Sequence, residues 1–299
     1  MSATRPLADL RRDDAARFGA KSASLGELLA AGVPVPRGFA VASDAPLDDT
    51  LRAEVAAAYA ELGDDPAVAV RSSALGEDGA EASFAGQHDT FLWVRGAEAV
   101  WRALLDCHGS LENPEAVAYR ERVRADAPPA MGVTVQLMVD ALVSGVMFTC
   151  NPVNGDPSTV AVNASWGLGS AVVAGEVTPD EYRVNKVSGD VTVRTIGPKQ
   201  VEDLPDPAGA GTVRREVPAE RREAPCLDDA ALSALVDVGK RVERHFGSHQ
   251  DIEWALARDE GELLVLQSRP VTTRPRTEPP APRSALSLVM ETFGAKRDG

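Results

Sequence analysis

The side chains best suited to chemistry in this sequence lie in one segment, DIEWALARDEGELLVLQSRP, at residues 251–270. Asp251 and Glu253 are two positions apart, and so are Gln267 and Arg269. Because alternate side chains of a β-strand share a face, each pair would point to one side of its strand. Carboxylate and amide oxygens suit Mg²⁺, and a guanidinium can bind phosphate oxygens through two parallel hydrogen bonds. The segment therefore predicts a site for a magnesium-bound phosphate group.

A β-hairpin would bring these four side chains onto one face. With residues 258–262 as the loop and Ala257 paired with Leu263, Glu253 lies opposite Gln267. Asp251 then lies opposite Arg269, and the apolar side chains between the two acidic residues and after them face the core. The same residues could instead form a solvated outer face with an acid–arginine pair across the strands. On the strand period alone, the two interpretations are about equally supported.

The chain before this hairpin mixes helix and strand signals. Apolar residues at helical spacing follow Lys21, and residues 67–71 form a short apolar run that ends in a charge, as a buried strand that reaches a cleft would. From Val133 onward, β-branched segments divided by turn residues predict a series of strands. Residues 202–226 have no clean period and predict a long surface loop, whereas the Pro-rich stretch after Val271 is typical of an extended linker.

The overall charge excludes some classes of partner. The 299 residues carry a formal net charge of −14, which disfavours binding to nucleic acid or to anionic membranes. Any site for an anionic substrate must therefore gather lysine, arginine and metal ion locally. The most apolar stretch, residues 133–149, contains Gln136, Asp140 and Gly145, so we interpret it as buried strands rather than a membrane span.

The cysteines and the N-terminus indicate a cytoplasmic protein. Cys107, Cys150 and Cys226 are far apart and form no CxxC pair, so neither a disulfide framework nor a zinc site is expected. The first residues, MSATRPLADLRRDD, lack the apolar region of a secretory signal.

Residues 67–91, AVAVRSSALGEDGAEASFAGQHDTF, closely resemble the nucleotide-binding signature of the phosphoenolpyruvate synthase, pyruvate phosphate dikinase and rifampin phosphotransferase family. Six further segments match that family in the same order. They are FGAKSASLGEL (18–28), VTVQLMV (133–139), SGVMFTCNP (144–152), NASWGLGSAVVAGEVTPDEYRVNK (163–186), QDIEWAL (250–256) and LLVLQSRPV (263–271). Together the matches cover residues 18–271, so chance resemblance is very improbable.

The resemblance implies an α+β fold of the ATP-grasp type, with ATP held in the cleft between two lobes. The lobes would span residues 1–130 and 131–275, with adenine and metal on the second lobe, followed by a Pro-rich linker and tail at 276–299. It also implies ATP and Mg²⁺ as the cofactors.

The resemblance further implies a role for each residue that matches the family pattern. The expected catalytic, phosphate-contacting residues are Lys21, Arg71 and Arg269, and the expected metal ligands are Glu253 and Gln267. The expected ATP-binding residues are Ser72, Ser83, Gly86, Gln87, Gln136, Leu137, Met138 and Asp251. Taken singly, Lys21 could be a surface lysine, Gly86 a plain turn glycine and residues 136–138 a core strand.

The chemistry that the family implies is attack by a histidine on the β-phosphoryl group of ATP, which gives AMP and a pyrophosphorylated histidine. Two departures bear on this chain. Ser170 stands where the family usually has a glutamate after WGLG, and no Thr-x-His motif of the family's phosphohistidine domain occurs in these 299 residues. We therefore expect an ATP-dependent phosphotransferase subunit that passes the group to a histidine on a separate partner protein, for transfer to an undetermined small-molecule acceptor.

Two alternatives stay open at this point. The chain could transfer phosphate directly from ATP to a small molecule, as kinases and ATP-grasp ligases do. It could also be a regulatory nucleotide-binding module without catalysis, although the presence of all the expected ligands argues against that.

Overall fold

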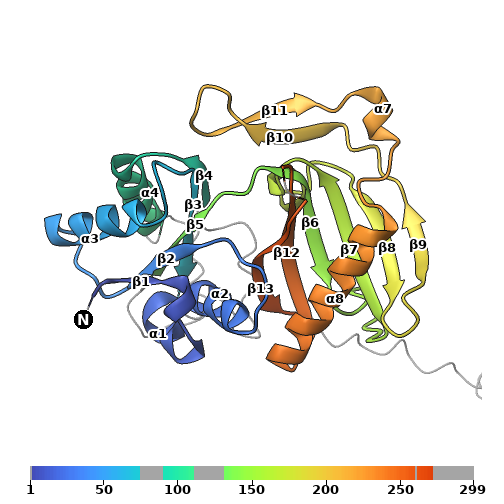
Figure 1. Cartoon of the computed structure of the whole chain (residues 1–299), viewed down its shortest axis with the longest axis horizontal. Helices are drawn as coiled ribbons and strands as arrows, with labels where there is room; N and C mark the ends of the chain where they lie inside the picture. Colours follow the sequence, from blue (N-terminus) through green and yellow to red (C-terminus); the bar gives the residue numbers. More distant parts are fainter. Residues whose placement is uncertain (1, 75–89, 111–130, 260, 272–299) are drawn as a thin grey trace, which may run out of the picture.

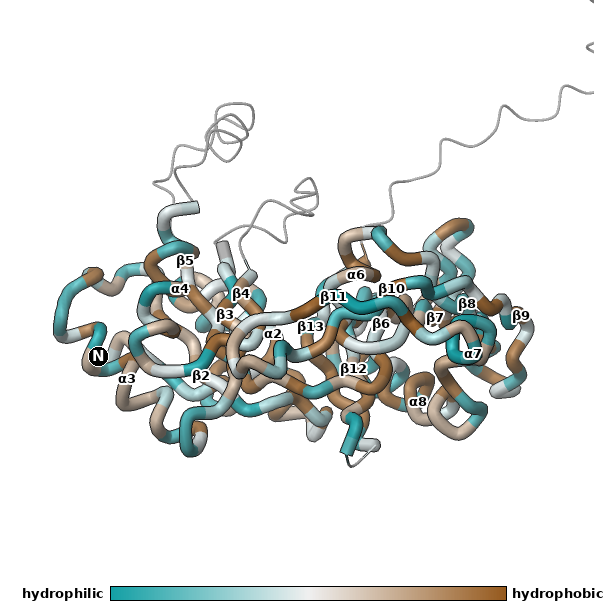
Figure 2. The backbone as a smooth tube through the Cα atoms, turned by 90° about the horizontal axis from the view of Figure 1, so that it is seen from above, coloured by the Kyte–Doolittle hydropathy of each residue, from teal (hydrophilic) through white to brown (hydrophobic). Residues whose placement is uncertain are grey.

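The computed structural model describes residues 2–74, 90–110, 131–259 and 261–271 of the chain. These residues form two mainly antiparallel sheets, one of five strands and one of six, with a separate two-stranded ribbon. The sheets lie side by side, with the strands of the first at one end of the molecule and those of the second at the other (Figures 1 and 2). In the described part of the chain, every helix is too short or too polar to cross a membrane.

The first sheet has the strand order β1-β2-β5-β3-β4. Its strands are β1 (Thr4–Pro6), β2 (Gly38–Val41), β3 (Val68–Ala74), β4 (Thr90–Val94) and β5 (Met131–Leu137). One face packs on two helices, α3 (Asp49–Ala60) and α4 (Ala97–Gly109), through a cluster that includes Val70, Val133 and Leu104. Helix α3 begins where the side chain of Asp48 accepts hydrogen bonds from two backbone amides, as an N-cap residue does.

The second sheet has the strand order β13-β12-β6-β7-β8-β9. Its strands are β6 (Ala141–Phe148), β7 (Thr159–Trp166), β8 (Asp180–Asn185), β9 (Val191–Thr195), β12 (Gln250–Ala257) and β13 (Leu263–Pro270). Helix α8 (Asp229–Phe246) lies across one face of it (Figure 1). Buried Leu232, Leu235 and Val242 recur at helical spacing on α8, so its apolar side is the one that packs on the sheet.

The prediction of a long loop over residues 202–226 is wrong. Strands β10 (Val201–Pro205) and β11 (Thr212–Glu216) form an antiparallel ribbon, and a short helix, α7 (Ala219–Arg222), follows. The ribbon joins neither of the large sheets, and apolar and polar residues do not alternate along its strands VEDLP and TVRRE, so no strand pattern marks it in the sequence. Its end reaches the first sheet, where Gly211 N donates a hydrogen bond to Trp93 O at 3.0 Å.

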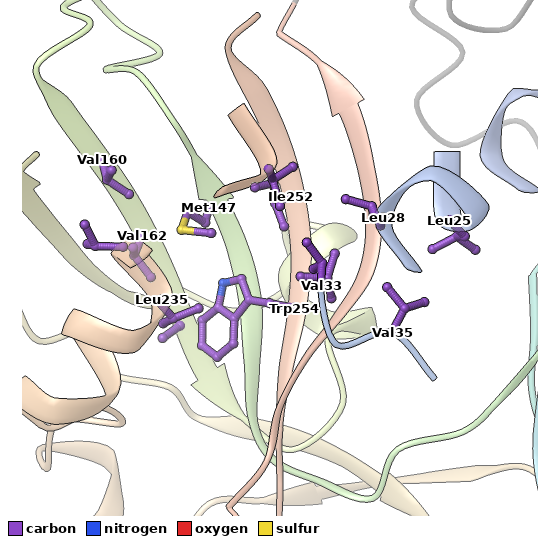
Figure 3. Close-up of a cluster of buried hydrophobic side chains, with 14 of the residues drawn as sticks. Leu25, Leu28, Val33, Val35, Met147, Val160, Val162, Leu235, Ile252 and Trp254 are labelled. Carbon is purple, nitrogen blue, oxygen red and sulfur yellow. The ribbon is translucent and has the colours of Figure 1, made fainter. Parts of the chain in front are cut away.

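A third group of elements joins the two sheets. The N-terminal turns η1 (Leu7–Asp9) and η2 (Arg12–Asp14) lead to helices α1 (Ala15–Phe18) and α2 (Ala20–Ala30). Helix α2 packs on the first sheet and also against β13 of the second. Leu28, Val33 and Val35 therefore belong to the same buried cluster as Ile252 and Trp254 (Figure 3). The two lobes share one hydrophobic core on this side.

The chain passes from the first sheet to the second between β5 and β6. Strand β5 lies between β2 and β3, so the first sheet extends to residue 137, a few residues beyond the expected lobe boundary at 130/131. All three cysteines are buried, and none takes part in a disulfide.

Candidate functional site

The hairpin of β12 and β13 carries the four side chains that the sequence singled out. Glu253 lies directly opposite Gln267, and Asp251 lies directly opposite Arg269, which confirms both predicted pairs. Directly opposite residues have Cβ atoms about 5 Å apart, so the carboxylate and the amide of the first pair can reach one ion together.

The predicted pairing of Ala257 with Leu263 is wrong by one residue. Leu256 is the partner of Leu263, and the register shifts between Trp254 and Glu253. Such a bulge adds one residue to one strand and locally changes which side chains face the core. As a result Val265 is the apolar residue of β13 whose side chain is fully buried in the core.

Asp251 and Arg269 form an ion pair on this face. Arg269 Nε donates to Asp251 Oδ2 at 2.9 Å, and its Nη2 lies 2.8 Å from the same oxygen. The side chain of Asp251 is 13% exposed and that of Arg269 is 50% exposed. Burial raises the pKa of Asp251 above its ordinary value, and the nearby charge of Glu253 adds to this, although Arg269 opposes both. Asp251 thus holds the guanidinium of a half-exposed arginine side chain.

Arg71 connects the two lobes at the same place. It lies on β3 of the first sheet, and its Nη1 is 3.5 Å from Glu253 Oε2 on the second. The two side chains are 17% and 28% exposed. Arg71 Nε is buried and has no hydrogen-bond partner within the described residues. Because buried donors are nearly always satisfied, an anion is a fitting acceptor for this nitrogen.

Lys21 approaches Arg71 from helix α2. Its Nζ donates to the carbonyl oxygen of Ser72 at 3.2 Å, and its backbone N donates to Ser73 Oγ at 3.1 Å. Lysine, arginine and the hairpin therefore come together from three different elements. This provides the local positive charge that an acidic protein needs for an anionic substrate.

The two serines after Arg71 point to opposite faces of β3. By the alternation of the strand, Ser73 shares the face of Arg71 and α2, whereas Ser72 shares the face of Val70, which packs with α3 and α4. Ser72 Oγ is buried without a partner in the described part of the chain. The side chain of Ser72 remains a predicted ATP contact, while the structure records only its carbonyl near Lys21.

The expected adenine-binding strand already uses two of its amides. Leu137 N donates to Arg37 O at 2.8 Å, and Met138 N donates to Ala67 O at 2.9 Å. The Gln136 side chain is buried, with Nε2 3.5 Å from Pro36 O. An adenine base bound here would thus contact carbonyl oxygens and side chains rather than these two amides.

A small apolar cluster adjoins the polar site and draws on both lobes. Its buried members are Trp93, Ala141, Leu168 and Ala255, and the partly buried Ala67, Met138, Val139 and Leu266 pack against it. Ala255 is two positions from Glu253 on β12, so it lies on the same face as the polar groups. The cluster places apolar surface beside Met138, where the sequence predicts the base.

Ser170 begins α6 (Ser170–Val173) and is tied into a hydrogen-bond network. Its Oγ donates to Asp203 Oδ2 at 2.5 Å, and Arg214 Nε donates to Asp203 Oδ1 at 2.8 Å. Burial raises the pKa of Asp203, but the hydrogen bonds from Arg214 and Ser170 outweigh it and hold the pKa below its ordinary value. The Ser170 hydroxyl is thus hydrogen-bonded to a residue of the β10–β11 ribbon, and this position provides no carboxylate.

The remaining predicted residues Ser83, Gly86 and Gln87 lie outside the described residues. Ser73 is the residue at the site whose contact the sequence did not predict. Ser73 lies two positions after Arg71, but its hydrogen bond to Lys21 joins residues 52 positions apart, which no local pattern predicts.

The donor set fits Mg²⁺ when tested on its chemistry. In the described residues no group of three or more His, Cys, Asp or Glu side chains is placed to hold a metal. A site made of one carboxylate oxygen and one amide oxygen does not need such a group of three side chains. It suits Mg²⁺ because this ion retains waters and binds substrate phosphates. Glu253 and Gln267 would hold it, with Asp251 nearby.

Comparisons with known proteins show which proteins this chain resembles. Residues 43–287 match the family described as "Pyruvate phosphate dikinase, AMP/ATP-binding domain". The probable phosphoenolpyruvate synthase of Methanothermobacter thermautotrophicus is 39% identical over 314 residues, which cover 89% of this chain and 45% of that protein. A rifampicin phosphotransferase of a Streptomyces species is 45% identical over 229 residues, covering 76% of this chain and 26% of that protein. The chain spans less than half the length of these relatives.

Among solved structures, the fold resembles a dinucleotide-forming acetyl-coenzyme A synthetase of Ca. Korarchaeum cryptofilum. The sequences are 14% identical, the TM-score is 0.44, and the match covers 83% of this chain and 90% of that one. A similarity of this size carries no argument about function. The family match and the two-lobed arrangement of antiparallel sheets and helices confirm the predicted α+β, ATP-grasp fold class.

Proposed function

Since this chain belongs to the pyruvate phosphate dikinase AMP/ATP-binding domain family, we propose that it is the ATP-binding component of a dikinase-type phosphotransferase. Mg²⁺·ATP is cleaved to AMP, and the pyrophosphoryl group passes to a histidine on a separate protein. That histidine then supplies a small-molecule acceptor. ATP binding and phosphotransfer follow from the family. The AMP product, the magnesium ion and the histidine-bearing partner are the content of the proposal.

The observation that carries the proposal is the approach of Arg71 to Glu253 across the two lobes, at 3.5 Å. It brings a phosphate-binding guanidinium next to the carboxylate and amide pair of the hairpin. Lys21 adds a second cation from α2, and its Nζ lies within 3.2 Å of the residue after Arg71. Phosphoryl transfer depends mainly on positioning and charge neutralisation, which is what such a set of groups provides.

The proposed step forms one bond and breaks one. A neutral imidazole nitrogen of the partner attacks the β-phosphorus, and the bond from that phosphorus to the α–β bridging oxygen breaks. AMP leaves with the oxygen, and the imidazole proton passes to solvent. Lys21, Arg71 and Arg269 bind the phosphate oxygens and stabilise the charge that develops on them. Mg²⁺, held by Glu253 and Gln267, would neutralise phosphate charge when bound.

The apolar cluster around Met138 is the proposed binding site of the adenine base. It lies at the crossing between the sheets, on the same face as the polar groups, so one nucleotide can span both. The three buried cysteines form no disulfide, which suits a reducing compartment, and on that ground we propose that the protein is cytoplasmic.

Product analysis tests the proposed reaction. The protein is incubated with Mg²⁺ and ATP, alone and with candidate histidine-bearing proteins, and AMP is separated from ADP. AMP that forms only with such a protein supports the proposal. ADP that forms with a small molecule and no histidine-bearing protein would refute it in favour of a direct kinase or ligase. Tight ATP binding with no turnover in any mixture would favour a regulatory module.

A matched pair of variants ties the reaction to the site. Arg71→Ala is expected to abolish AMP formation because it removes the guanidinium that approaches Glu253 from the first lobe. Arg102→Ala, on the exposed side of α4, is the control, since its side chain is 72% exposed and far from the hairpin in the fold. Equal activity of the two variants would contradict the proposed site.

A further inference from the structure

The start of helix α2 lacks a cap of its own. Gly19 is the N-cap residue, and it has no side chain that could accept a hydrogen bond from the first turn. The first amides of a helix have no partner inside the helix, and Ser, Thr, Asp or Asn usually supplies one from the N-cap position. Here Lys21 N instead donates to Ser73 Oγ, at 3.1 Å, so the cap comes from strand β3.

Two glycines allow the helix to begin directly on the strands. A Cβ at Gly19 would lie 2.1 Å from Ser73 Oγ, and the φ of Gly19 is +83°. A Cβ at Gly132, which pairs with Ser73 across the sheet, would lie 2.3 Å from Phe18 O. Neither position has room for a side chain. The same glycine that permits the close approach removes the usual cap, and Ser73 replaces it.

A second hydroxyl contact holds the next residue of the helix. Ser22 Oγ lies 2.6 Å from Thr134 Oγ1 on β5, and both residues are fully buried. Thr134 is the cross-strand partner of Arg71. The first turn of α2 is therefore fixed at two adjacent points, to β3, which carries Arg71, and to its neighbour β5, and these contacts set the distance between the helix start and the guanidinium.

We propose that Ser73 is a positioning residue for Lys21, which holds the Lys21 backbone so that its ammonium group meets the phosphates beside Arg71. This role requires no contact between Ser73 and the nucleotide. It acts through the bond from the Lys21 amide, while Lys21 Nζ rests on the carbonyl of Ser72. This inference rests on the proposed function for the role of Lys21, and the capping contact can be tested without it.

The test compares two serines that each make one buried hydroxyl contact at the same helical turn. Ser73→Ala removes the acceptor for the Lys21 amide, whereas Ser22→Ala removes the contact with Thr134 and leaves that amide bonded. Both are made in the wild-type chain and in Lys21→Ala. Calorimetry with Mg²⁺ and ATP gives the dissociation constant, and hydrogen exchange reports protection of the Lys21 amide.

We expect Ser73→Ala to weaken ATP binding by roughly 5- to 10-fold. This is the factor by which loss of a helix cap typically shifts a folding equilibrium, and the same loss should apply to the position of Lys21. The loss should vanish in the Lys21→Ala background, because Ser73 acts only through Lys21. Lys21 amide exchange should accelerate in Ser73→Ala and not in Ser22→Ala. An equal loss of affinity in both backgrounds would overturn the inference.

The remaining outcomes separate this inference from the proposed function. A wild-type chain that binds no ATP would refute the function, and unchanged Lys21 exchange in Ser73→Ala would then overturn the capping as well. ATP binding that Lys21→Ala leaves unaltered would overturn the positioning role while the ATP-binding function stands.

Discussion

Replacing Glu253 by glutamine should separate the stability of the fold from the affinity of the site. Glu253 faces Arg71 at 3.5 Å, and both side chains are partly exposed. At an effective dielectric constant of about 20, two charges at that distance attract by roughly 5 kcal/mol. Desolvation and loss of side-chain freedom cancel most of this, and partly exposed pairs contribute about 1 kcal/mol or less. We therefore expect the melting temperature of the ligand-free protein to fall by less than about 4 °C.

The effect on magnesium should be much larger. Glu253→Gln keeps the shape of the side chain but removes the only carboxylate of the proposed donor pair. Loss of an outer partner of a metal ligand typically lowers metal affinity by about 10- to 100-fold, and loss of a charged ligand should lower it at least as much. The assay titrates Mg²⁺ at fixed ATP and measures bound nucleotide, with a thermal melt of each protein alongside.

The control for this variant is Glu262→Gln. Glu262 is an exposed residue in the loop of the same hairpin. Its replacement removes the same carboxylate charge at a position away from the proposed ligands. It should bind Mg²⁺ and ATP like the wild type. A Glu253→Gln protein with unaltered magnesium dependence would refute the assignment of this carboxylate, and so would an equal loss in Glu262→Gln.

Three further predictions concern the elements that hold the site. Trp254→Ala should lower the free energy of unfolding by about 3–5 kcal/mol in urea titrations, because the side chain is 1% exposed in the shared core; a loss below about 1 kcal/mol would contradict that packing. Gly19→Ala should destabilise the protein by at least about 2 kcal/mol more than Gly32→Ala, since both have positive φ but only the first would clash; equal thermal unfolding of the two would argue against the close contact with Ser73. The raised pKa of Asp251 means that the folded state binds the proton more tightly, so its contribution to stability declines as pH rises from 3.8 through the raised value. Asp251→Asn should remove that slope in denaturation measured across this pH range, and an unchanged slope would show that other groups cause it.

The sequence predicts the hairpin pairs because they depend on local geometry. Alternation along two strands and one short loop suffices to place Glu253 opposite Gln267. The bulge pairs Leu263 with Leu256 in place of Ala257. The alternation does not predict it, because an extra residue changes the strand register without changing the residue types. The predicted pairing was right for Glu253 with Gln267 and for Asp251 with Arg269, and wrong next to the loop.

The contacts between distant elements could not be predicted in this way. The bond between Lys21 and Ser73 depends on how α2 lies on β3, and no spacing in the sequence encodes that orientation. The same is true of Ser170, whose hydroxyl meets Asp203 on a ribbon that has no periodic pattern. Family resemblance identified Lys21, whereas only the fold shows what holds it.

The core shared by the two lobes also determines how the protein unfolds. Val33 and Val35 of the first lobe pack with Trp254 of the second, so separating the sheets would expose apolar surface that belongs to both (Figure 3). We expect a single cooperative unfolding transition rather than one per lobe. A nucleotide that binds only the folded state would then protect the entire core, by about 2.7 kcal/mol at a concentration 100-fold above its dissociation constant. A thermal shift on adding ATP would therefore report on both sheets at once.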